Sequence, residues 1–61
     1  MYTILRSVGG GSWTQDVLGH GLPARVCNEW PDILTADKAM NIMRTATNAD
    51  LLIIARVEDL P

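Results

Sequence analysis

The strongest constraint on the fold is a change of hydrophobic spacing within residues 35–60, TADKAMNIMRTATNADLLIIARVEDL. From Ala36 onward, apolar residues recur at helical spacing and occupy one arc of about 160° on a helical wheel. These residues are Ala36, Ala39, Met40, Ile42, Met43 and Ala46. The pattern predicts an amphipathic helix from Ala36, with Thr35 as its N-cap and Asn48 as its left-handed terminator.

A strand is predicted directly after this helix, at residues 51–58. Its first half, Leu51 to Ile54, is apolar on both faces, which is typical of a strand inside a sheet. Arg56 and Glu58 share the face of Leu52 and Ile54. We therefore expect that face to meet solvent, and the alternate face of Leu51, Ile53, Ala55 and Val57 to pack against the helix.

The first 30 residues predict the rest of a sheet. Residues 2–8 are rich in β-formers, and the three glycines behind them predict a hairpin connection with positive φ angles. Thr14 stands where a dinucleotide-binding G-x-G-x-x-G motif needs its third glycine, so a phosphate cradle is not expected. Residues 12–18 give a weak strand signal, and residues 24–30 alternate well enough to predict a half-buried strand.

These elements predict one α+β domain over residues 1–61, in the order β-β-β-α-β. We expect a small three- to four-stranded, mostly antiparallel sheet with one helix packed on one face. A single helix leaves the second face of such a sheet without a cover. That face is the expected place for a binding surface or a dimer contact.

Composition excludes several classes of protein. The chain is 48% hydrophobic with a net charge of -2, which favours folding over disorder. Cys27 and His20 are the only residues of their types, which excludes an intrachain disulfide and a Cys/His zinc site, and we expect no cofactor. The five basic residues are scattered singly, so direct nucleic-acid binding is not expected. No apolar run reaches a membrane-spanning length, and the lone cysteine favours a cytoplasmic protein.

Catalytic residues are not evident in the sequence. Cys27 and His20 could form a nucleophile and base, oriented by Asp16 or Asp32, and this minimal enzyme is one hypothesis. A single cysteine in a predicted strand is more often a small packing residue, and a histidine between two glycines is more often a loop residue. We therefore expect the protein not to be an enzyme.

The two tryptophans give the most specific indication of a binding function. Trp30 is in register with Val26 and is predicted to lie in the core. Trp13 follows the glycines in a polar segment, and if exposed it would anchor a protein partner, because tryptophan is favoured at interface centres. The predicted partner-binding residues are Trp13 and the acidic residues Asp16, Glu29, Asp32, Glu58 and Asp59.

In brevity, acidic balance and sheet-plus-helix architecture, the whole chain resembles the small inhibitors of bacteriophages and other mobile elements, anti-CRISPR proteins in particular. No motif carries the resemblance, so it transfers no functional residues. It implies a stoichiometric inhibitor in the host cytoplasm, which binds a CRISPR effector complex on a basic surface that otherwise meets nucleic acid. The alternative function is a small homo-oligomeric structural or accessory subunit that uses its uncovered sheet face to associate with itself, and we expect the protein to be a monomer or a weak homodimer.

Overall fold

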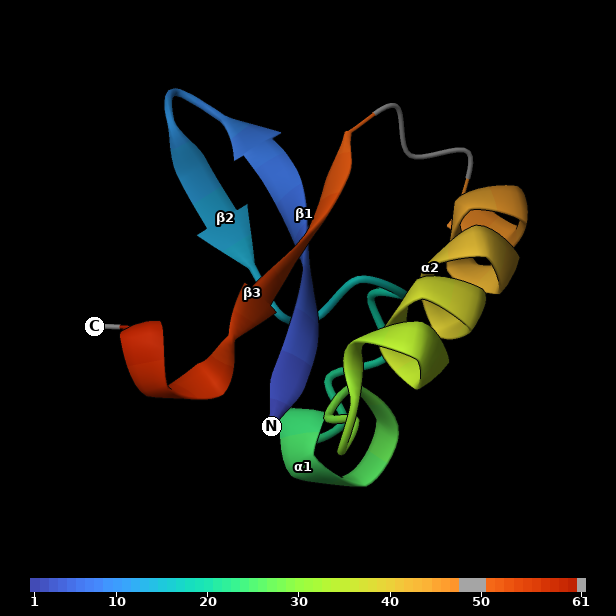
Figure 1. Cartoon of the computed structure of the whole chain (residues 1–61). Helices are drawn as coiled ribbons and strands as arrows, with labels where there is room; N and C mark the ends of the chain where they lie inside the picture. The colour runs from blue at the N-terminus through green and yellow to red at the C-terminus, as the bar shows by residue number, and fades with distance from the viewer. Residues whose placement is uncertain (48–50, 61) are drawn as a thin grey trace.

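The computed structural model describes residues 1–47 and 51–60, in which three antiparallel strands form a sheet in the order β2-β1-β3 (Figure 1). The elements are β1 (Tyr2–Gly9), β2 (Ser12–Thr14), α1 (Ala24–Cys27), α2 (Ile33–Thr47), β3 (Leu52–Arg56) and the 3-10 helix η1 (Val57–Asp59). The long helix α2 lies on one side of the sheet, and η1 lies on the other (Figure 1). The predicted α+β class, a small antiparallel sheet with one main helix, is confirmed.

The hairpin at the start of the chain forms as predicted. β1 pairs with β2 through Arg6 with Thr14 and Ser7 with Trp13. Gly9, Gly10 and Gly11 have φ angles of 90°, 61° and 79°, which only glycine adopts without strain. The returning strand is shorter than the predicted 12–18, because it ends at Thr14 and the chain then turns toward the core.

The core lies between the sheet and α2. Ile4 is fully buried and packs with Val17, Met43 and Leu52, while Trp30, Ala39, Met40 and Ile54 surround this cluster. The predictions of a core-facing Trp30 and of an alanine and methionine helix face are therefore confirmed. Ile42 and Ala46 were placed on that face wrongly, since both are exposed: Ile42, at the border of the arc, is 71% exposed, and Ala46 lies at the end of the helix.

The start of α2 differs from the prediction. The helix begins at Ile33, and Asp32 is its N-cap in place of Thr35. One carboxylate oxygen of Asp32 accepts hydrogen bonds from the backbone N–H of Thr35 at 2.8 Å and from its hydroxyl at 2.9 Å. A carboxylate one residue before the helix satisfies a free N–H and suits the helix dipole, so the cap moves to Asp32. The predicted terminator Asn48 lies outside the described residues.

The two faces of β3 are the reverse of the prediction. Its register with β1 pairs Ile54 with Ile4 and Leu52 with Arg6, so Leu52 and Ile54 face α2. Leu52 is 6% exposed, whereas Ile53 on the other face is 39% exposed. Arg56 and Glu58 suggested the opposite arrangement. They do not place the Leu52 face in solvent, because Arg56 is the last residue of the strand and Glu58 belongs to η1.

The predicted strand 24–30 is wrong. Residues Ala24–Cys27 form α1, whose N-cap Pro23 has a φ of -58°, and only Trp30 pairs with the sheet, in a single bridge to Tyr2. Proline already has the φ angle that a helix start requires. Val26, which the alternation placed inward, is 72% exposed.

A side chain replaces the missing strand. Asn28 is 2% exposed, and its side-chain oxygen accepts the N–H of Ile4 at 2.9 Å while its amide donates to the Ile4 carbonyl at 2.7 Å. The same amide donates to the Gln15 carbonyl, and the Thr3 hydroxyl donates to the Asn28 carbonyl. The backbone groups of β1 that point away from β3 therefore have partners in turn: Tyr2 bonds to Trp30, Ile4 bonds to the Asn28 side chain, and Arg6 pairs with Thr14.

Candidate functional site

The face of the sheet away from α2 is the candidate site, and we call it the open face. Strand alternation and register place on it Thr3, Leu5, Ser7, Trp13, Ile53 and Ala55. Thr3 and Leu5 at its centre are buried, whereas Trp13 is 40% and Ile53 39% exposed. The face therefore has a closed centre with large apolar side chains around it.

A hollow of about 510 Å³ lies on this face beside Trp13, lined by Leu5, Gly11, Trp13, Thr14, Gln15 and Leu60. Leu60 comes from the segment behind η1, which the chain brings to this side of the sheet (Figure 1). Gln15 is held in place because its amide donates to the Thr3 hydroxyl at 3.2 Å. The hollow joins apolar walls to polar groups, which is the usual composition of a recognition pocket.

The predicted acidic residues do not gather around Trp13, and none of them lines this hollow. The carboxylate of Asp16 accepts the backbone N–H groups of His20 and Gly21 and so holds the loop after β2. Asp32 caps α2, and its pKa is lowered by the hydrogen bonds from the Thr35 backbone and side chain. Both carboxylates have structural partners.

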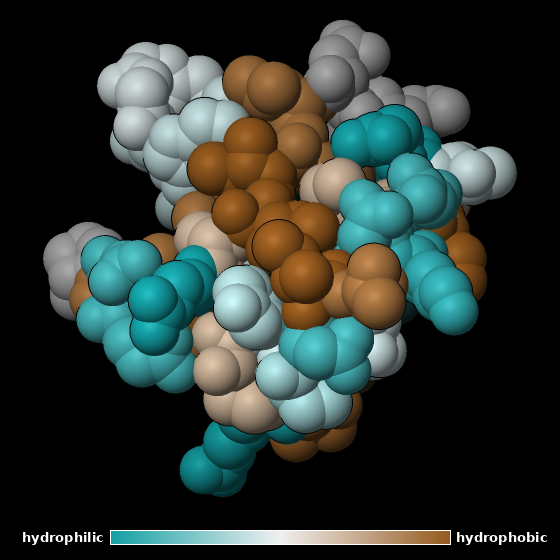
Figure 2. All heavy atoms as spheres, in the orientation of Figure 1, coloured by the Kyte–Doolittle hydropathy of each residue, from teal (hydrophilic) through white to brown (hydrophobic). Residues whose placement is uncertain are grey.

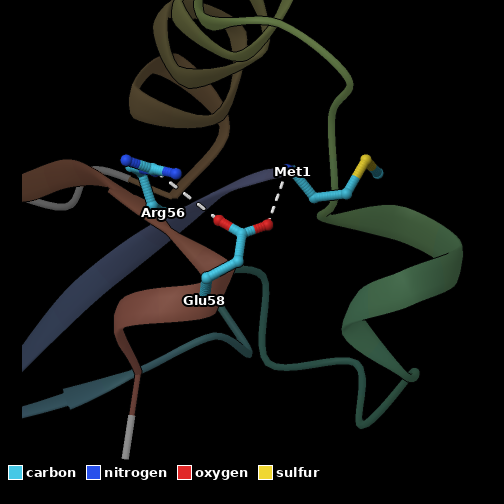
Figure 3. A network of polar contacts seen from close by, with 3 residues as sticks. All are labelled: Met1, Arg56 and Glu58. Carbon is cyan, nitrogen blue, oxygen red and sulfur yellow. Dashed lines mark hydrogen bonds and ion pairs between the residues drawn. The ribbon is translucent and has the colours of Figure 1, made fainter.

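Glu58 lies in a network that joins the two ends of the chain (Figure 3). Its carboxylate accepts a hydrogen bond from the amine of Met1 at 3.0 Å and lies 3.6 Å from the Nε of Arg56. The hydrogen bond from the amine is the main reason that the pKa of Glu58 is lowered. The negative charge of Glu58 is therefore balanced within the chain. The neighbouring Asp59 forms no ion pair with Met1 or Arg56.

Glu29 completes the predicted set, and it is half-buried between Asn28 and Trp30. Sequence reasoning missed Leu5 and Leu60 as site residues. Leu5 was one apolar residue among several in a strand, and Leu60 belongs to no periodic segment. Only the path of η1 across the sheet brings them beside Trp13.

A second hollow brings together the residues of the enzyme hypothesis. Asp16, His20 and Cys27 all line a space of about 30 Å³, which is room for about one water molecule. The Sγ of Cys27 donates to the Pro23 carbonyl, and the Asp16 carboxylate binds backbone N–H groups rather than the imidazole. No described hydrogen bond joins Cys27 to His20, so the three residues are neighbours without the relay of a nucleophilic triad.

Residues 1–47 and 51–60 show neither a metal site nor a membrane-spanning helix. This part of the chain holds no group of three His, Cys, Asp or Glu side chains placed to bind a metal ion. It also holds no helix with the length and apolar character needed to span a bilayer. Comparison with protein-family models, with curated proteins and with solved structures finds no match to this chain.

Proposed function

We propose that this protein is a non-enzymatic protein-binding module that uses its open face, with Trp13 as the anchor. The observation that carries the proposal is the position of Trp13, which is 40% exposed and lines the hollow together with Leu5 and Leu60. A large exposed aromatic residue beside an apolar hollow is the arrangement found at the energetic centres of protein interfaces.

The expected partner presents one apolar side chain for the hollow and a neutral or basic surface around it. Asp59 precedes Leu60, which lines the hollow, and the net charge of the protein is -2. Both favour a neutral or basic partner surface. Following the resemblance to anti-CRISPR proteins, the first partner to test is a CRISPR effector complex, whose nucleic-acid binding the protein would block. At this charge the block would be steric rather than an imitation of the nucleic-acid backbone.

Affinity capture from a host lysate tests the proposal with three folded baits: wild type, Trp13→Ala and Ile42→Ala. Ile42 is the matched control, because it is an exposed apolar side chain on α2, on the opposite side of the sheet. Trp13→Ala should weaken binding by about 2 kcal/mol, or roughly thirtyfold in Kd, as interface tryptophans do. Ile42→Ala should bind as wild type.

Equal capture by Trp13→Ala and wild type would remove the open face as the binding site. The hypothesis of a CRISPR target has its own test, which measures DNA binding by a purified CRISPR effector complex as this protein is added. Loss of DNA binding near equimolar protein supports it. Unchanged DNA binding, together with a Trp13-dependent partner of another kind, rejects the CRISPR target and keeps the binding module.

A further inference from the structure

The outer edge of β3 is a second surface, separate from the open face and its hollow. The backbone pattern shows which groups point outward there. Ser7 donates to the Leu51 carbonyl and Val57 donates to the Met1 carbonyl, so odd-numbered residues of this segment bond to β1. The N–H and C=O groups of Leu52, Ile54 and Arg56 therefore point away from β1.

The two sides of the β1–β3 pair differ. On the side of β1 away from β3, the outward backbone groups meet Trp30, Asn28 and Thr14 in turn. On the β3 edge, the outward N–H and C=O of Ile54 and the outward N–H of Arg56 have no hydrogen-bond partner among the described residues, whereas Arg56 is the N-cap of η1 and its C=O accepts the first bond of that helix. Leu52 is only 6% exposed, so the accessible part of this edge is Ile54 to Arg56.

Apolar side chains surround this edge. Leu51 is 51% and Ile53 39% exposed on one side, and the half-buried Ile54 and Met40 lie on the side of α2. Figure 2 has the same orientation as Figure 1, in which β3 crosses in front of β1, and apolar atoms fill the centre of this view. β3 contains no proline, no lysine and no bulge in its register with β1, and its one charged side chain, Arg56, lies at its end.

We propose that this edge pairs with the β3 edge of a second copy of the chain, antiparallel about a twofold axis at Ala55. This register pairs Ile54 of each copy with Arg56 of the other, so the outward N–H of Arg56 in each copy meets the outward C=O of Ile54 in the other. The small side chains of Ala55 meet at the axis, Ile53 lies opposite Val57, and no arginine faces another arginine. The edge is thus complementary to itself.

The position of α2 fits the same arrangement. α2 lies over both β1 and β3, so strands about 4.8 Å apart would place the two copies of α2 about 10 Å apart, a normal helix-packing distance. Ala46 lines a hollow with Arg6 and His20 on the β2 side of the sheet, so Asp37, Met40 and Arg44 lie on the flank toward the β3 edge. A twofold axis reverses the helices and brings the Asp37 half of one flank toward the Arg44 half of the other.

Sedimentation equilibrium of wild type, Arg56→Pro, Arg56→Ala and Trp13→Ala up to ~1 mM tests the pairing, since an interface this small is weak. Wild type should dimerise, and Arg56→Pro should weaken dimerisation by about tenfold or more, because proline removes the outward N–H of the edge. Arg56 already has a φ of -80°, close to that of proline, and its N–H makes no bond to β1, so the fold should persist. Arg56→Ala is the matched control, as it loses the same side chain and keeps the N–H, and it should dimerise as wild type.

Amide hydrogen exchange of the wild-type protein gives a second readout that needs no variant. Exchange at Arg56 should slow as protein concentration rises, while Ile53 and Ala55, which bond to β1, should be protected at every concentration. A wild-type protein that stays monomeric at ~1 mM, or a dimer that folded Arg56→Pro forms equally well, overturns the proposal. Dimer loss in Trp13→Ala but not in Arg56→Pro would assign self-association to the open face instead, and also overturns it.

Discussion

Asn28 does at the scale of one residue what a strand does elsewhere in a sheet. Its side-chain amide has the same donor and acceptor as a backbone peptide group, so it can pair with both outward groups of Ile4. Its own carbonyl and the Gln15 carbonyl are bonded as well. A buried polar side chain is favourable only when it is satisfied in this way.

Replacing Asn28 with alanine should lower the free energy of unfolding by about 2–4 kcal/mol, because it leaves buried backbone groups of Ile4 without partners. A chain of this length has a total stability of roughly 3–9 kcal/mol, so this loss is a large share of it. Urea denaturation measures the change. Thr3→Val is the control, since it removes only hydroxyl bonds at the same site and should cost about 1 kcal/mol. Equal stability of Asn28→Ala and wild type would contradict the role of this network.

Among the secondary-structure elements, α2 shows how one carboxylate sets a boundary. Asp32 accepts the free backbone N–H of Thr35, and the helix starts at Ile33, three residues before the expected start at Ala36. Because those hydrogen bonds favour the charged carboxylate, the pKa of Asp32 lies below its ordinary value of 3.8. A lowered pKa means that the stabilisation is complete above 3.8 and is lost as pH falls through the pKa of the folded state.

Asp32→Ala should lower the melting temperature at pH 7, whereas Asp32→Asn should keep most of it, because asparagine is an equally good N-cap. Lowering the pH from 5 to below 3.8 should remove the advantage of wild type over Asp32→Ala. The asparagine variant should keep its own advantage there, since its amide does not titrate in this range. Circular dichroism melts at several pH values measure these differences, and a pH-independent gap between wild type and Asp32→Ala would refute the capping role.

At the scale of the whole molecule, the network of Met1, Arg56 and Glu58 joins the two ends of the chain (Figure 3). It holds the start of β1 beside η1, next to the segment that carries Leu60 to the open face. The network is solvent-exposed, so we expect a modest effect that salt reduces.

Glu58→Gln should lower the melting temperature slightly at pH 7 and low salt. The pKa of Glu58 is lowered from its ordinary value of 4.5, so its contribution is present above 4.5 and lost as pH falls further. The difference between the variant and wild type should therefore disappear at acid pH and shrink in high salt. Asp59→Asn is the control variant, because it also removes one negative charge from η1 but does not break the contacts with Met1 and Arg56. A difference that survives at acid pH would show that Glu58 acts through packing instead.

Local patterns predicted the elements whose causes are local. The hairpin follows from three consecutive glycines, and the amphipathic helix follows from the spacing of Ala36, Ala39, Met40 and Met43. The exposed position of Trp13 was open in the sequence, because a polar, weakly alternating segment is compatible with either face. Its acidic neighbours were chosen by charge alone, and the fold uses Asp16, Asp32 and Glu58 for loops, caps and chain ends.

By itself, therefore, the sequence determined the class of the fold, the hairpin and the apolar face of the helix, since each depends on residues near one another in the chain. The tertiary structure decided which face of β3 is buried, because strand register is fixed by the pairing of Ile54 with Ile4 and not by the charges that follow. It also decided that residues 24–27 form a helix and do not extend the sheet, since the side chain of Asn28 bonds to the Ile4 groups with which a strand would pair. Both decisions depend on contacts between distant residues, which periodicity does not record.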